Sequence, residues 1–166
     1  MMKSFVFSGW LICLLVWMQA CYTFTGASVS PDTKTVSVET FQNVSTNVIP
    51  TLSQRFSEAL RDKIISQSTL SLKPNDGHVQ FSGQITKYSI DPIAIQGSTA
   101  GQNRLTITVT VQFRDTQHPE KNWEQSFSQF ADFSTGVNFS SVENQLIDEI
   151  NEKLTTDIFN KSFANW

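Results

Sequence analysis

The fold of this 166-residue chain is decided by one stretch, LTITVTVQFR, at residues 105–114. Every odd-numbered residue in it is apolar and every even-numbered residue is polar. Because successive side chains of a strand point to opposite faces of the sheet, this alternation predicts a strand with one buried face and one solvated face. One-sided strands are typical of antiparallel sheets. Other elements of the chain must therefore cover the apolar face.

Further strands are predicted on both sides of this stretch. The polar residues 115–122 predict a hairpin loop, and the spaced apolar residues of 123–133 predict the strand that follows it. Residues 79–90 also form a strand, but the parity of its apolar residues changes after Ile85, which indicates a bulge or a change of face near residues 86–87. A short first strand is predicted at residues 36–40.

Two amphipathic helices supply the cover for the apolar face. Apolar residues recur at helical spacing over residues 52–64 and, every four residues, over 142–158. Each helix is preceded by residues that fit a capping box, in which a hydroxyl and a side chain three residues later satisfy free backbone N–H groups. The predicted boxes pair Thr51 with Gln54, and Ser140 with Glu143.

The predicted element order is β-α-β-β-β-α. The first helix is a crossover that makes the first two strands parallel, and the remaining strands form a meander. Both helices and the central strand have one apolar face each, so the expected fold is an α+β two-layer sandwich with two helices packed on one face of a four-stranded mixed sheet.

The N-terminal residues have the pattern of a secretion signal. Lys3 precedes a mostly apolar run at residues 5–18, which is short for a membrane-spanning helix. The run ends in MQAC at residues 18–21, which resembles a lipobox. We therefore expect residues 1–20 to be a lipoprotein signal peptide and Cys21 to carry lipid, since two or more acyl chains hold a protein stably on a membrane. An ordinary signal peptide with a chance cysteine and an uncleaved anchor are the alternatives.

The rest of the chain is predicted to be a lipidated N-terminal tether at residues 21–35 and a single domain at residues 36–166. Cys13 lies in the predicted signal peptide, so the mature domain has no thiol for a disulfide. A domain of this size can fold on an ordinary hydrophobic core.

The sequence offers no catalytic constellation, and we expect a protein that is not an enzyme and has no cofactor or metal. His78 and His118 lie in polar loops without metal-ligand spacing, and Asp91, before Pro92, is predicted to shape a turn. There is no nucleophile elbow and no phosphate-binding glycine loop. Twelve Lys and Arg against fifteen Asp and Glu, with no basic cluster, argue against a nucleic-acid partner.

The chain is rich in phenylalanine, and most of these residues fit core positions. Phe139, Phe163 and Trp166 are the exceptions, and they are predicted to form a patch that faces a partner.

Four stretches carry a resemblance to a known family. They are CYTFTG at residues 21–26, PTLSQRF at 50–56, NRLTITV at 103–109 and DIFNKSFANW at 157–166. Together and in this order they resemble the LptE family, the outer-membrane lipoproteins of lipopolysaccharide assembly. The resemblance covers nearly the whole chain after residue 20 and implies two helices on a four-stranded mixed sheet, in agreement with the prediction from the residues.

The resemblance also implies a function and a location. It implies an outer-membrane lipoprotein whose domain faces the periplasm or lies inside the lumen of the large barrel LptD, as a plug that helps the barrel to assemble and binds lipopolysaccharide. By their chemistry, Arg104, Arg114 and Lys121 are candidates for contact with lipid A phosphates, although solvated strand-end charges explain them equally well. A lipid carrier, or an adaptor of another envelope or secretion machine, is the alternative function, and a lipid-anchored enzyme is a more remote one.

Overall fold

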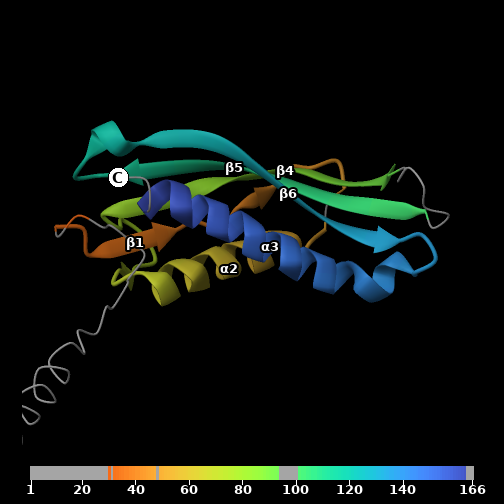
Figure 1. Ribbon diagram of the computed structural model, residues 1–166. Helices are drawn as coiled ribbons and strands as arrows, with labels where there is room; N and C mark the ends of the chain where they lie inside the picture. The colour runs from red at the N-terminus through yellow and green to blue at the C-terminus, as the bar shows by residue number, and fades with distance from the viewer. Residues whose placement is uncertain (1–29, 31, 48, 94–100, 164–166) are drawn as a thin grey trace, which may run out of the picture.

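The computed structural model of the chain describes residues 30, 32–47, 49–93 and 101–163 (Figure 1). The predicted signal peptide, Cys21 and Trp166 lie outside the described residues. The elements in chain order are β1 (Thr35–Val38), β2 (Gln42–Asn43), α2 (Leu52–Gln67), β3 (Ser71–Leu72), β4 (Val79–Ile93), β5 (Gln102–Asp115), the short 3-10 helix η1 (Pro119–Lys121), β6 (Trp123–Ser134) and α3 (Phe139–Phe163).

The sheet has six strands rather than the predicted four. Its order is β3-β1-β4-β5-β6, and β2 pairs with β4 beside this path. The two strands that the prediction missed, β2 and β3, contain two residues each and pair in parallel with their neighbours. A dipeptide is too short to show an alternating pattern, so pairing rather than sequence defines these strands.

The predicted connections are otherwise confirmed. β1 pairs in parallel with β4, with Val36 opposite Val79 and Val38 opposite Phe81, and α2 lies between the two strands in the chain. β4, β5 and β6 form an antiparallel meander. The mixed sheet with a crossover helix is therefore the expected α+β architecture with two short strands added.

Both helices cover the same face of the sheet, as Figure 1 shows. The apolar, odd-numbered residues of β5 from Leu105 to Val111 are completely buried against them. The helices contribute their own fully buried stripes, which are Leu52, Phe56, Leu60 and Ile64 on α2 and Ile150, Leu154 and Ile158 on α3. The predicted two-layer core is confirmed.

The predicted bulge in the second long strand is also confirmed. The pairing of β4 with β5 shifts between Ile85 and Lys87, which leaves Thr86 as the extra residue. The extra residue returns the side chains to the same face, so Ile85 and Tyr88 are both buried under the helices although they differ in parity. Nearby, Gly83 allows the strands to approach, because a Cβ there would lie 2.1 Å from the Thr110 carbonyl oxygen.

Neither predicted capping box forms. Thr51 makes no side-chain capping bond, and Gln54 instead donates to Glu58 one turn later at 2.8 Å. The second helix begins earlier than predicted because the turn after β6 places Asn138 before it, and the Asn138 carboxamide oxygen accepts from the Ser140 N–H at 3.1 Å. The residue that caps a helix depends on where the helix begins, and the position of the preceding strand fixes that point.

The predicted patch of aromatic residues is wrong for Phe163. Its side chain is 2% exposed and packs against Phe81, Phe113 and Phe159. α3 continues to Phe163, four residues after Phe159, and so brings this ring onto the core stripe. Phe139 is half-buried against Phe133.

Candidate interaction surface

The face of the sheet opposite the helices carries almost only polar side chains. We call it the outer sheet face. Its members include Gln80, Ser82, Gln84, Lys87, Ser89 and Asp91 of β4, Arg104, Thr106, Thr108, Thr110, Gln112 and Arg114 of β5, and Glu124, Ser126, Ser128, Phe130 and Asp132 of β6. The alternation that buries the odd residues of β5 places the even ones here.

Cross-strand hydrogen bonds order this face along β5 and β6. The hydroxyl groups of Thr108 and Ser128 lie 3.0 Å apart, and the equivalent pair, Thr110 and Ser126, lies 2.8 Å apart. Each hydroxyl has one donor and two acceptor sites, so these pairs keep capacity for a further partner. The outer sheet face is therefore a pre-ordered surface that can hydrogen-bond water, a protein or a saccharide.

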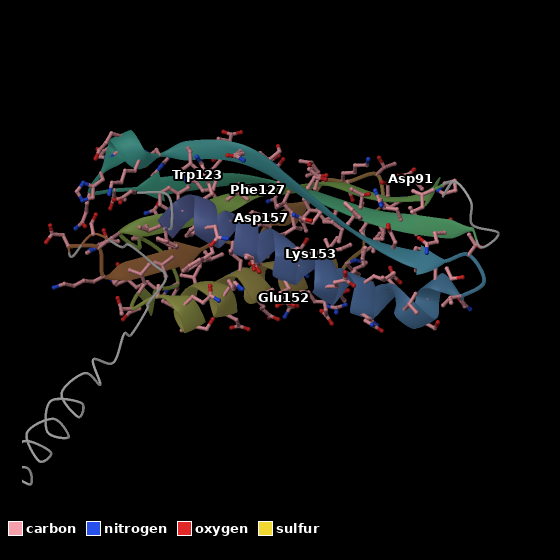
Figure 2. The ribbon with its side chains drawn as sticks, in the orientation of Figure 1. Asp91, Trp123, Phe127, Glu152, Lys153 and Asp157 are labelled. Atoms are coloured by element: carbon pink, nitrogen blue, oxygen red, sulfur yellow. The ribbon has the colours of Figure 1, made fainter. Side chains whose placement is uncertain are left out.

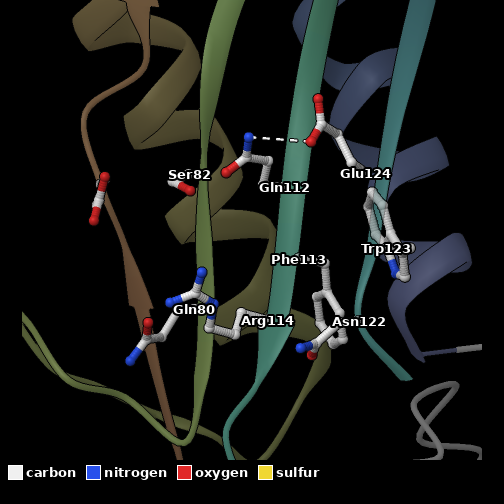
Figure 3. Close-up of a pocket in the computed structure, with 9 residues that line it drawn as sticks. Gln80, Ser82, Gln112, Phe113, Arg114, Asn122, Trp123 and Glu124 are labelled. Carbon is white, nitrogen blue, oxygen red and sulfur yellow. Dashed lines mark hydrogen bonds between the residues drawn. The ribbon is translucent and has the colours of Figure 1, made fainter. Parts of the chain in front are cut away.

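A shallow groove crosses the outer sheet face near the β5–β6 hairpin (Figure 3). Its volume is about 480 Å³, and Gln80, Gln112, Arg114 and Glu124 are among its lining residues. Gln112 donates to Glu124 across it at 3.2 Å. A second depression of about 330 Å³ adjoins it over Gln84 and Thr110. Both are lined mainly by polar groups, so they suit a hydrated ligand better than an acyl chain.

Arg104 is held at the other end of the outer sheet face. Its Nε and Nη2 donate to the two carboxylate oxygens of Asp132 at 2.7 and 2.9 Å, and its guanidinium carbon lies 3.6 Å from the centre of the Phe130 ring. The hydrogen bond from Arg104 is the main cause that lowers the pKa of Asp132, and Asp132 in turn raises the pKa of Arg104. The ion pair and the ring fix the orientation of this guanidinium.

The three basic residues predicted to meet lipopolysaccharide do not form one cluster. Arg104 and Arg114 share a face, but ten residues separate them along β5, which corresponds to roughly 33 Å of extended strand. Arg114 is exposed, and its side chain makes no hydrogen bond or ion pair with the described residues. Lys121 belongs to η1 in the hairpin, where its ammonium donates to the Ser30 hydroxyl at 3.1 Å.

The other polar residues singled out in the sequence have structural partners. His78 Nδ1 accepts from the Lys34 N–H at 3.3 Å, and His118 Nδ1 lies 3.6 Å from Glu120. Asp91 lies in β4 rather than in a turn, and it accepts from the Ser89 hydroxyl at 3.0 Å. Within the described residues, no three His, Cys, Asp or Glu side chains are grouped as a metal site.

One residue of the outer sheet face, Phe130, was not identified from the sequence. Phe130 is 41% exposed, and its ring centre lies 3.6 Å from the Arg104 guanidinium carbon and 6.0 Å from Lys153 Nζ. Lys153 Nζ also donates to the Phe130 carbonyl oxygen. The available signal was parity, because Phe130 is an aromatic residue at a position where its β6 neighbours Ser128 and Asp132 are polar.

Among the helices of the described chain, none is long and apolar enough to span a bilayer.

Comparison with known proteins gives one family and a set of shared folds. Residues 33–162 match the family model described as "LptE: Lipopolysaccharide-assembly". A homologue of neuraminyllactose-binding hemagglutinin from Helicobacter pylori is 10% identical, with 84% of this chain and 88% of that chain covered and a TM-score of 0.51. Protein XCC0632 from Xanthomonas campestris is 7% identical, with 81% and 91% covered and the same TM-score. At these identities the two structures share the fold alone. No curated protein sequence matches the chain.

Proposed function

Because the chain belongs to the LptE lipopolysaccharide-assembly family, we propose that it plugs an LptD-like outer-membrane barrel, helps that barrel to assemble, and takes part in delivery of lipopolysaccharide to the cell surface. In this proposal Cys21 carries the lipid anchor, and the domain lies in the periplasm or the barrel lumen. The protein acts by stoichiometric binding and not by turnover.

The observation that supports the plug proposal is the polar exterior of the sheet and of α3, although Ile65 on α2 is 44% exposed. The outer sheet face is polar, and every exposed position on α3 is polar or charged: Ser140, Ser141, Asn144, Gln145, Asp148, Glu149, Glu152, Lys153, Asn160 and Lys161. The lumen of an outer-membrane barrel is polar, in contrast to its lipid-facing exterior. A domain with polar surfaces on both sides therefore suits a lumen.

The filled core favours a plug over a lipid carrier. A carrier needs an apolar cavity that encloses an acyl chain. Here the space between the helices and the sheet is occupied by packed side chains, many of them fully buried, such as Phe56, Phe81 and Ile107. The depressions on the outer sheet face are open and mainly polar.

For lipopolysaccharide itself, Arg114 is the best placed of the three candidate contacts. Its guanidinium is exposed, lines the groove of about 480 Å³ and has no partner among the described residues. Arg104 would have to exchange its bond with Asp132 for a phosphate. We therefore expect Arg114→Gln to weaken binding of lipopolysaccharide more than Arg104→Gln does.

The test is the stoichiometry of the protein after gentle extraction. The tagged full-length lipoprotein, taken from membranes in mild detergent, should co-purify with a much larger β-barrel protein in near one-to-one amounts. An obligate contact of this kind buries above about 2,000 Å² and should survive salt washing. Depletion should lower assembled barrel and surface lipopolysaccharide together. A protein that runs alone while it retains bound lipid would favour the carrier function and contradict the plug.

A further inference from the structure

One edge of the sheet is long and regular. β6 pairs only with β5, so no strand lies against its other edge in the part of the chain that the structure describes. Twelve consecutive residues, Trp123–Ser134, pair with β5 without a bulge. The opposite edge of the sheet is β3, which contains only two residues. Native proteins usually protect a long edge with a bulge, a proline or lysines, and β6 contains none of these.

The even-numbered residues of β6 direct their backbone groups to this edge. In an antiparallel pair, alternate residues exchange hydrogen bonds with the neighbouring strand, and the residues between them point away from it. The Thr135 N–H donates to the Gly101 carbonyl at 3.1 Å, which assigns the odd-numbered residues to the side of β5. Lys153 of α3, outside the sheet, donates to the Phe130 carbonyl at 3.0 Å. Both contacts give the same alternation.

Lys153 closes one half of this edge and leaves the other half open. Figure 2 shows Lys153 on α3. Its ammonium occupies the carbonyl of Phe130, in the second half of β6. In the first half, the outward N–H and C=O groups of Glu124, Ser126 and Ser128 have no partner among the described residues, and all three residues are exposed. We call these three residues the open edge.

The spacing of the open edge identifies its ligand as an extended peptide. The outward groups recur at every second residue, about 6.8 Å apart along a strand. The backbone of another strand presents N–H and C=O groups at the same interval, and addition of a strand to a free edge is a recurring mode of peptide recognition. Glu124 is the one charged residue of the open edge, so a basic residue of the added strand would match it.

A second copy of the chain fits the open edge poorly. Symmetric pairing centred on Ser128 would place Glu124 opposite Asp132, which brings two carboxylates together. Symmetric pairing centred on Ser126 is limited to a few residues, because Lys153 closes the edge beyond Ser128. An isolated pair of short strands is marginal in water, whereas stable dimers bury roughly 1,200 Å² or more.

We propose that the open edge receives one extended segment of the barrel partner, which adds to the sheet beside β6 and carries a basic residue near Glu124. Such a segment needs no stability of its own, because it belongs to a plug contact that buries above about 2,000 Å². This inference rests on the proposed plug function and adds to it the place and the chemistry of one contact.

The test uses Ser126→Pro in the full-length lipoprotein. The Ser126 N–H points away from β5, so proline removes a donor of the open edge without loss of a bond to β5. The matched control is Ser126→Ala, which loses the same hydroxyl and its contact with Thr110 but keeps the N–H. After a salt wash, Ser126→Pro should retain about tenfold less barrel than Ser126→Ala, as expected when about two backbone hydrogen bonds are lost. Equal retention overturns the inference and leaves the plug function standing.

Crosslinking keeps the test decisive if Ser126→Pro melts lower than Ser126→Ala. A photo-crosslinking residue is placed at position 124, 126 or 128 of the otherwise unchanged chain. Because paired strands keep one register, the three proteins should label sites two residues apart along one barrel segment. Absence of this register, or a label on the lipoprotein itself, overturns the inference. A wild-type protein that retains no barrel overturns both the inference and the plug function.

Discussion

The hydroxyl of Tyr88 on β4 donates a 2.8 Å hydrogen bond to the Glu143 carboxylate on α3, 55 residues away. Tyr88 reaches the helical layer only because the bulge at Thr86 returns it to the buried face of the sheet. Burial, with a further contribution from Glu143, raises the pKa of the Tyr88 phenol above its usual range. The extra residue Thr86 in β4 therefore allows Tyr88 to bond with the start of the last helix.

Tyr88→Phe should lower the free energy of unfolding by about 1–2 kcal/mol, because it removes this hydrogen bond and leaves the ring packing intact. The raised pKa favours the neutral phenol in the folded state. The stabilisation is therefore full below the unfolded pKa of about 10 and declines as pH rises above it. Urea denaturation of both proteins from pH 7 to 11 measures this. A difference that does not shrink above pH 10 would contradict the assignment.

Val109→Asp should prevent stable folding, whereas Thr108→Asp should not. Val109 is completely buried at the centre of β5, so an aspartate there has no partner and costs several kcal/mol, roughly 3 or more. Thr108 lies on the outer sheet face, where it pairs with Ser128, and an aspartate there stays solvated at a cost of about 1 kcal/mol. Thermal melts compare the two. Equal melting temperatures would mean that the helices do not cover the face of β5 that carries its odd-numbered residues.

The Asp132 carboxyl should titrate below the ordinary value of about 3.9, since Arg104 stabilises its charged form. A folded pKa that lies below the unfolded one adds stability above about pH 4, and this contribution is lost as pH falls through the folded pKa. Carbon-detected NMR titration measures the midpoint. Arg104→Gln should raise it, and Lys153→Gln should raise it less, because Lys153 is the smallest contributor. The same midpoint in the wild type and in Arg104→Gln would refute the role of the ion pair.

Cys21→Ser should abolish lipidation and leave unprocessed precursor or a form released from the membrane, since the lipobox places the acyl chains on this residue. Metabolic labelling with a fatty-acid analogue measures it. Cys13→Ser, in the predicted signal peptide, is the control and should be labelled as the wild type is. Equal labelling of the Cys21→Ser protein would exclude the lipobox interpretation.

The parts of the fold that follow from periodicity within one element could be predicted from the amino-acid sequence. The alternation from Leu105 to Arg114 identified the central strand and its buried face, and the change of parity after Ile85 located the bulge. The two apolar stripes identified α2 and α3 and the side of the sheet that they cover. These features follow from the spacing of apolar residues, which recur every two residues in a strand and about every 3.6 residues in a helix. This spacing can be read from the amino-acid sequence without knowledge of the fold.

Contacts between residues of different elements could not be predicted in this way, because they depend on how the elements pack. Asp132 pairs with Arg104 because the register of β5 and β6 places them opposite each other, and Arg55 of α2 pairs with Asp148 because α2 packs beside α3. The strands β2 and β3 exist only through their neighbours. Strand register and the rotation of a helix about its axis follow from the packing of the whole core, so no local pattern in the sequence encodes these contacts.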